Sequence, residues 1–462
     1  MPEASIEIDD VQGMVLGGFN TDFQTFAALS LEQLDRLAVA LSWIASLSQE
    51  ITSAAAVAET RAQMKSGDAA PGYWAGVAVG KRVVDGLGDL LIRDAAFNGG
   101  IVARAPSILG DHTEPADWRV GKTAEPVDVL LVVGSNDPVA ADRAMDKLLN
   151  GAAAHGLRVS YREQGIRLSG EREHFGFRDG ISQPRIVGFD PDGTIEAGNF
   201  IFGYPAKPDA SPVLPVLDPR NLAPNGSLLV FRRLRQDVAA FQAFCVSEAK
   251  RASKEWPELT PEHLAALIVG RWPSGAPVKT GVSADPGGDP PSDDFNFHDD
   301  PEGSNCPLAA HIRKVNPRAG KRDEVDVPRI LRRGIPFGIS DHDRGLLFIA
   351  FQSAIPDQFE KLTRKWMNGG ISPNPGHDLL VGRSLSERTM MIAGPGGTVV
   401  IKSAGTPWII PTGGAYLFAP GKRALSRFSE RAIKSVFFSV RRLATSGFDQ
   451  TIDKITRSFQ RD

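Results

Sequence analysis

A short apolar run, a polar break and a stretch of helical period follow one another three times along this chain. The first unit begins with DVLLVVG at 128–134, after which Asp137 can cap a helix whose first turn accommodates Pro138. Apolar residues then recur at helical spacing as far as Gly156, and the segment 157–163 predicts a returning strand. A chain built from such units must cover sheets with helices.

Two later segments repeat this order. The runs SLLVFRRL at 227–234 and GLLFIAFQ at 345–352 each precede a segment with apolar residues at helical spacing. Apolar runs at 416–421 and 436–440 predict further strands near the end of the sequence. The units therefore occur in both halves of the chain.

The fold class predicted from this order is α+β. The strands are short, hairpin-like returns are frequent, and no glycine-rich nucleotide loop follows a strand, which disfavours a doubly wound fold. The boundary between two related sheets is expected near 200–226, which is dense in Pro, Asp and Gly. A second irregular stretch, 274–305, is too long for an ordinary connection and indicates a functional or disordered loop.

Composition disfavours several classes of protein. The formal net charge is -3, so no broad positive field attracts nucleic acid. The N-terminal MPEASIEIDD has no basic segment before an apolar run, and the run at 127–133 is too short to span a bilayer. Cys245 and Cys306 allow one disulfide at most. We therefore expect a cytoplasmic protein with no nucleic-acid or membrane partner, and leave a homo-oligomer open.

The segment HFGFRDGISQP at 174–184 is the first of three that carry candidate chemistry. Two glycines bracket a Phe-Arg-Asp trio, so the backbone can turn sharply and present Asp179 into a cavity. In isolation, an Asp beside a Gly is more often an ordinary turn, and His174 is more often a loop residue than a ligand.

The second segment is CPLAAHIRKVNPR at 306–318. Small residues precede His311, so a flat macrocycle could approach an imidazole that is a standard axial ligand for haem iron. Arg313 and Arg318 could neutralise haem propionates. A lone histidine is usually a solvated or core residue, and Cys306 with His311 makes a poor zinc site because no further ligand lies at the required spacing.

The third segment is PRILRRGIPFG at 328–338. Arg332 and Arg333 are adjacent on an extended stretch, so their side chains should point to opposite faces. One could enter a pocket while the other stays in solvent, although a solvated pair on an edge strand is the simpler interpretation.

Taken together and in order, these three segments resemble dye-decolourising peroxidases. Supporting similarities extend over most of the chain, at VQGMVLGGFN, FIFGYP, VGRWPSGAP, RGLLFIAFQSAIPDQFEKLTRKWMN and GGAYLFAPG. Each motif is weak alone, whereas the ordered set is specific. The resemblance implies an α+β fold of two ferredoxin-like halves, each an antiparallel sheet covered by helices, as in the dimeric α+β barrel superfamily.

The resemblance also implies a division of the chain and a cofactor. An N-terminal ferredoxin-like half over 1–205 would carry the distal acid, and 206–226 would be a Pro-rich connection. The C-terminal half over 227–462 would carry the haem ligand and the distal arginine. The cofactor would be haem b, iron protoporphyrin IX.

Site roles follow from the same resemblance. His311 would ligate the iron, and Asp179 and Arg332 would be the catalytic pair that activates hydrogen peroxide. Arg318, Gly180 and Arg313 would lie at the cofactor, with Arg318 near a propionate. Dyes, phenols or other small aromatic reductants would then be oxidised through a ferryl intermediate. Electron relay to the surface is expected from aromatic residues, for which core packing is the simpler role: Trp256, Trp366, Trp408 or Tyr416.

The sequence departs from the family pattern at one place. An acid that orients the proximal histidine is expected just upstream of GGAYLF, where Pro407 and Trp408 stand instead. Asp378, in GHDLL, could replace it from elsewhere. A missing acid would favour the alternative function, a haem-binding or iron-releasing protein of the deferrochelatase type with weak peroxidase activity. A third alternative is a structural protein without a cofactor.

Overall fold

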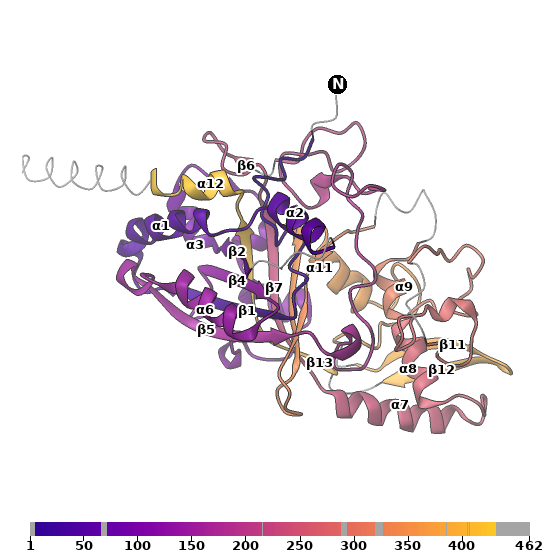
Figure 1. Cartoon of the computed structure of the whole chain (residues 1–462). Helices are drawn as coiled ribbons and strands as arrows, with labels where there is room; N and C mark the ends of the chain where they lie inside the picture. Colours follow the sequence, from indigo (N-terminus) through magenta and orange to yellow (C-terminus); the bar gives the residue numbers. More distant parts are fainter. Residues whose placement is uncertain are drawn as a thin grey trace, which may run out of the picture.

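One large antiparallel sheet organises the part of the chain that this computed structural model describes: residues 5–430 without 66–71, 215, 288–292, 319–326, 385, 404 and 406 (Figure 1). Its strands are β1 (Phe23–Leu31), β2 (Trp74–Val79), β4 (Val129–Ser135), β5 (Leu157–Ile166), β7 (Ser227–Gln236), β8 (Leu331–Arg332), β9 (Ile335–Phe337), β10 (Gly345–Gln352) and β13 (Ile409–Ala419). Two small sheets pair β3 (Leu91–Ile92) with β6 (Val216–Leu217) and β11 (Arg388–Gly394) with β12 (Gly397–Ser403).

Helices connect and cover these strands. They are α1 (Leu37–Ser46), α2 (Ala54–Lys65), α3 (Lys81–Leu87), α4 (Ala95–Gly99), α5 (Ile101–Arg104), α6 (Pro138–Leu149), α7 (Val238–Ala252), α8 (Pro261–Val269), α9 (His311–Val315), α11 (Phe359–Lys361) and α12 (Lys422–Ser426). Two π-helical stretches, η3 (Ala105–Leu109) and η9 (Leu362–Met367), continue α5 and α11.

The strand order closes the large sheet into a barrel. The N-terminal half contributes β2-β4-β1-β5 and the C-terminal half contributes β13-β7-β10-β9, each with antiparallel neighbours. A single pair joins β2 to β13, Val79 with Phe418, and another joins β5 to β9, Gly165 with Phe337. A side chain at Gly165 would place its Cβ 2.4 Å from the Ile335 Cγ2 atom, so the second seam closes only around a glycine.

Apolar side chains fill the barrel from both halves. The rings of Phe26 on β1 and Phe231 on β7 stack with their centroids 5.8 Å apart. Residues of the N-terminal segment, including Val11, Met14 and Leu16, are buried in the same cluster. Alternate residues of these strands face outward and pack with residues of α1, α3 and α6 in a second cluster.

A third cluster lies outside the barrel, away from α1, α3 and α6 (Figure 1). It joins residues of α7 and α8 to the β11–β12 hairpin and includes the buried rings of Trp272 and Trp408. Ala309 and Ala310, which directly precede α9, are buried in it. The residues that directly precede His311 are therefore packed in this cluster.

The structure confirms the α+β class and the repeated units. Asp137 caps α6 by accepting hydrogen bonds from the backbone N–H groups of Val139 and Ala140, and β5 is the returning strand. The strand expected at 436–440 lies outside the described residues, and the domain limits at 205 and 226 stay predictions. Both cysteines are buried free thiols. Within the described residues, no helix is long and apolar enough to cross a membrane.

A buried ion network fastens the N-terminal half to the C-terminal half. The Asp111 carboxylate accepts one hydrogen bond from Arg232 on β7 and another, at 2.8 Å, from Arg383. All three side chains are at most 4% exposed, and burial lowers the pKa of Arg383. Removing the carboxylate would leave two guanidinium groups without their shared counter-charge.

We therefore expect Asp111→Ala to lower the free energy of unfolding by about 3–5 kcal/mol, the cost of breaking a buried ion pair. Urea denaturation followed by circular dichroism measures this change. Asp117→Ala, in an exposed carboxylate six residues downstream, is the control and should stay within about 0.5 kcal/mol of the wild type. Equal stabilities for the two variants would contradict this role of Asp111.

Candidate active site

His311 begins the short helix α9, and its ring is held by a carboxylate from another segment. The Nδ1 atom donates a hydrogen bond of 2.8 Å to Asp378 Oδ2, a residue 67 positions further along the chain. The His311 side chain is 22% exposed, whereas Asp378 is completely buried. Nδ1 thus carries the hydrogen, and the lone pair stays on Nε2, where a metal could be bound.

Asp378 is itself fixed by its surroundings. Its Oδ1 atom accepts hydrogen bonds of 3.0 Å from the backbone N–H groups of Leu380 and Val381. Positive charge lies nearby on Lys314 and Arg388: burial lowers the pKa of Lys314 to about 8 and lowers that of Arg388, and the Asp378 charge opposes both shifts. This carboxylate is therefore oriented before any ligand reaches His311.

The segment upstream of GGAYLF holds no acid, and the carboxylate in contact with His311 is that of Asp378. Trp408 occupies the expected place and packs its ring 5.1 Å from Phe241 and 4.7 Å from Phe244, measured between centroids. The suggested replacement by Asp378 is confirmed as a contact. His311 therefore has the carboxylate partner that the alternative function would lack.

Asp179 and Arg332 come together from the two halves of the chain. The Asp179 Oδ1 atom lies 3.9 Å from Arg332 Nη1 and accepts a 2.7 Å hydrogen bond from the Gly180 N–H group. The side chains are 42% and 36% exposed. Gly180 has φ +79°, and no heavy atom lies within 4 Å of the position where its Cβ would stand. Open space therefore adjoins this pair.

The backbone around each member of the pair is anchored to other elements. The loop before Asp179 is tied to β9 by a 2.9 Å hydrogen bond between His174 Nε2 and the Phe337 carbonyl oxygen. Arg332 lies on β8, opposite Ala350 of β10. Arg333 points to the other side, as expected, but its Nη2 atom donates to the Val15 carbonyl oxygen instead of lying in solvent.

Ser182 connects Arg332 to Arg318. Arg332 Nη2 donates to the Ser182 carbonyl oxygen at 3.0 Å, and Arg318 Nη2 donates to the Ser182 hydroxyl at 3.3 Å. Arg318 also pairs with Asp293 at 2.7 Å and stacks over the Phe295 ring. Asp179, Arg332 and Arg318 thus belong to one connected group.

Arg313 is placed differently from Arg318. Its side chain is 5% exposed, and its guanidinium donates to Asp300 and to the Cys306 carbonyl oxygen. These contacts support a role in holding the segment that leads into His311, and its contact with a cofactor stays a prediction.

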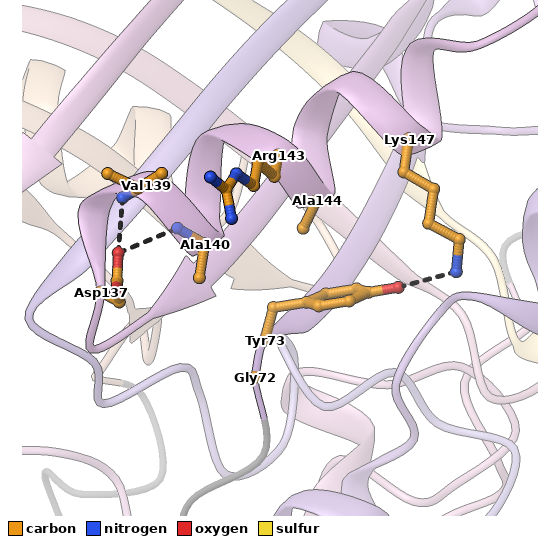
Figure 2. Close-up of a pocket in the computed structure, with 8 residues that line it drawn as sticks. All are labelled: Gly72, Tyr73, Asp137, Val139, Ala140, Arg143, Ala144 and Lys147. Carbon is orange, nitrogen blue, oxygen red and sulfur yellow. Dashed lines mark hydrogen bonds between the residues drawn. The ribbon is translucent and has the colours of Figure 1, made fainter.

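Other features lie apart from these residues. A pocket of about 320 Å³ is lined by Tyr73 and Lys147 with residues of α6, and none of the predicted site residues lines it (Figure 2).

Trp366, Trp408 and Tyr416 are buried, and Trp256 packs edge-on against His263. Their burial agrees with core packing, and electron relay stays a prediction.

Residues 170–374, which hold Asp179, His311 and Arg332, match the family model described as Dyp-type peroxidase, C-terminal. The Multifunctional dye peroxidase DyP2 of Amycolatopsis sp. is 30% identical over 337 residues, 64% of this chain and 69% of that protein. The chain belongs to the dye-decolourising peroxidase family.

The chain is similar to further proteins, over different lengths. A dye-decolorizing peroxidase of Exidia glandulosa is 28% identical over 92% of this chain and 87% of its own length. A Deferrochelatase of Yersinia pseudotuberculosis matches less of both chains, with 29% identity over 48% of this chain and 43% of that protein.

Solved structures show the same fold. An ancestral D-type dye decolorizing peroxidase superposes with a TM-score of 0.77 at 27% identity, over 91% of this chain and 99% of that one. A dye-decolorizing peroxidase in complex with 2,6-dimethoxyphenol superposes with a TM-score of 0.75 at 26% identity, over 92% and 100% of the two chains.

The residues present fit the haem that this family implies. An axial position needs one unshared imidazole nitrogen, and His311 Nε2 has no hydrogen-bond partner among the described residues. A carboxylate behind the ring, as Asp378 is here, strengthens the basicity of such a ligand. Arg332, Arg318 and the open space at Gly180 supply cations and room for an anionic, planar group.

We expect Asp378→Asn to weaken haem binding by about 10- to 100-fold, the usual cost of losing the partner of a ligating histidine. An asparagine amide would donate to Nδ1, so the ring hydrogen would move to Nε2 and block the lone pair. Titration of the haem-free protein with haemin, followed at the Soret band, measures this change. Asp357→Asn, in an exposed carboxylate, is the control, and equal affinities in both variants would contradict this role of Asp378.

Proposed function

We propose that the protein binds haem b through His311 Nε2 and reduces hydrogen peroxide, taking electrons from dyes, phenols or other aromatic donors. The observation that carries the proposal is the pair Asp179–Arg332, a carboxylate and a guanidinium 3.9 Å apart beside open space. A proton acceptor and a fixed positive charge are the two groups that peroxide cleavage needs from a protein.

Bound haem would supply the iron centre and the storage of oxidising equivalents. The surrounding chain does the remaining work. Asp378 keeps the ring of His311 in one tautomer and one orientation. Arg318, which shares Ser182 as a hydrogen-bond partner with Arg332, offers a cation for a propionate.

Asp179 is the residue that we assign to proton transfer. Its Oδ1 atom is engaged by the Gly180 N–H group and faces Arg332, while Oδ2 has no partner among the described residues. Oδ2 can take a proton from one oxygen of hydrogen peroxide and deliver it to the other, and bound haem would supply the two electrons with which that oxygen leaves as water.

Arg332 supplies the charge that this transfer requires. A guanidinium keeps its proton throughout the neutral range, so it can stabilise negative charge on the departing oxygen. The hydrogen bond from Arg332 to the Ser182 carbonyl oxygen fixes the guanidinium close to Asp179.

Aromatic donors are supported by a structural neighbour. The peroxidase in complex with 2,6-dimethoxyphenol shares the fold over nearly its whole length. The deferrochelatase alternative rests on a shorter match. It was favoured by the lack of an acid beside the proximal histidine, whereas in the structure Asp378 contacts His311. The cytoplasmic location and a homo-oligomer stay predictions.

We expect Asp179→Ala to retain haem but to slow the reaction with hydrogen peroxide by about 10²- to 10⁴-fold, the contribution of a general base. Stopped-flow absorbance after mixing with peroxide measures the rate, and the Soret band of the resting protein measures haem content. Asp192→Ala removes an exposed carboxylate and serves as the control.

Two outcomes would contradict the proposal. A haem-loaded Asp179→Ala protein that reacts at the wild-type rate would remove Asp179 from the mechanism. Release of iron from haem without consumption of peroxide by the wild-type protein would instead favour the deferrochelatase function.

A further inference from the structure

Glu173 accepts three hydrogen bonds close to Asp179, and neither the family pattern nor the proposed mechanism uses it. Its Oε2 atom accepts from the Phe175 N–H group at 2.9 Å and from the Gln236 side-chain amide, and Oε1 accepts from the Phe177 N–H group at 3.0 Å. The Glu173 N–H group in turn donates to the Phe177 carbonyl oxygen at 2.9 Å. One carboxylate thus closes a small loop of backbone.

This loop ends at the distal acid. Gly176 lies between the two N–H donors with φ +98°, a left-handed conformation that lets both donors face one carboxylate. The rings of Phe175 and Phe177 are buried in the cluster of α7 and α8, and Phe175 lies 4.9 Å from Phe241 between centroids. Two residues after Phe177 comes Asp179, so the position of Asp179 depends on this loop.

Gln236 connects the loop to the barrel. It is the last residue of β7 and is 4% exposed, so its amide is fixed by the sheet. Glu173 precedes the Pro-rich connection, and β7 follows it. The Glu173–Gln236 contact therefore ties the loop that carries Asp179 to the half of the protein that carries His311.

The charge of Glu173 is not balanced. No Lys, Arg or His forms an ion pair with it among the described residues, and the nearby carboxylate of Asp179 repels it. Burial, aided by that repulsion, raises the pKa of Glu173 to about 7. The Gln236 Oε1 atom is buried without a partner, and a half turn of the amide, which now directs Nε2 at Glu173, would let Oε1 accept a hydrogen bond from protonated Glu173.

We propose that Glu173 is the positioning residue of the distal loop: its carboxyl group accepts from the Phe175 and Phe177 N–H groups and so fixes Asp179, and ionisation, which leaves a charge without a cation, loosens that hold. This inference rests on the proposed function for the role of Asp179. A protonated carboxyl keeps lone pairs for both backbone donors and can direct its O–H group toward Gln236.

The direction of the pH effect follows from the raised pKa. Below pH 7 Glu173 is neutral and the closed loop is more stable, whereas above pH 7 it carries a buried charge without a cation and the loop is looser. Other titratable groups face the loop: Asp179, Glu171 paired with Arg178, and His174 with Arg344 near it. Burial lowers the pKa of His174, which moves its change of charge to lower pH than that of an exposed histidine.

Hydrogen–deuterium exchange of the full-length haem-free protein tests the loop directly. In the wild type, protection of the Phe175 and Phe177 amides, corrected for intrinsic exchange, should fall as the pH increases through 7. In Glu173→Gln the protection of these amides should not vary through pH 7, because the glutamine side chain does not ionise. Glu258→Gln, in an exposed carboxylate, is the control and should match the wild type.

The haem-loaded protein supplies a second readout. The rate of reaction with hydrogen peroxide should show an inflection near pH 7 in the wild type and in Glu258→Gln, and none in Glu173→Gln. A residue with only a structural role would change the rate equally at every pH.

Wild-type protection that does not vary through pH 7 would overturn the proposal, and that measurement requires no variant. A folded Glu173→Gln protein whose protection falls through pH 7 as in the wild type would overturn it as well. If the wild type fails to react with peroxide, the proposed function fails, and the exchange experiment still decides whether Glu173 controls the loop.

Discussion

Closure of the barrel is the constraint on which the rest of this structure depends. Each half-sheet has an apolar face that stays exposed unless the other half covers it, and the interior cluster draws on both halves. The seams at Val79–Phe418 and Gly165–Phe337 bring the ends of distant strands together. The loop of Asp179 and the strand of Arg332 meet because these halves are locked in one register.

Four carboxylates of this structure perform different tasks because their surroundings differ. Asp378 is buried among N–H donors and cations and orients His311. Asp179 is open to its surroundings and keeps one oxygen free, as a group that exchanges protons must. Asp111 links two buried arginines, whereas Glu173 lacks a cation and titrates near neutrality. Environment, more than residue type, assigns each role.

The features that can be predicted from the sequence are those that residues close together in it determine. The capped helix after Asp137 follows from nearest neighbours, and the segments of Asp179, His311 and Arg332 are recognisable as short motifs. Asp378 was a weak suggestion because its contact with His311 spans 67 positions, which no local rule reports. Glu173 was missed because a glutamate in a loop appears solvated until Gln236 is brought beside it.

The seam between β2 and β13 also bears on how the chain reaches this fold. Val79 pairs with Phe418, which is synthesised near the end of the described chain. Until then, β2 and β5 are unpaired edges of a four-stranded sheet, and such edges pair readily with wrong strands. Contacts this distant in sequence also form slowly. The yield of folded protein should therefore depend on how long these two edges remain without their partners.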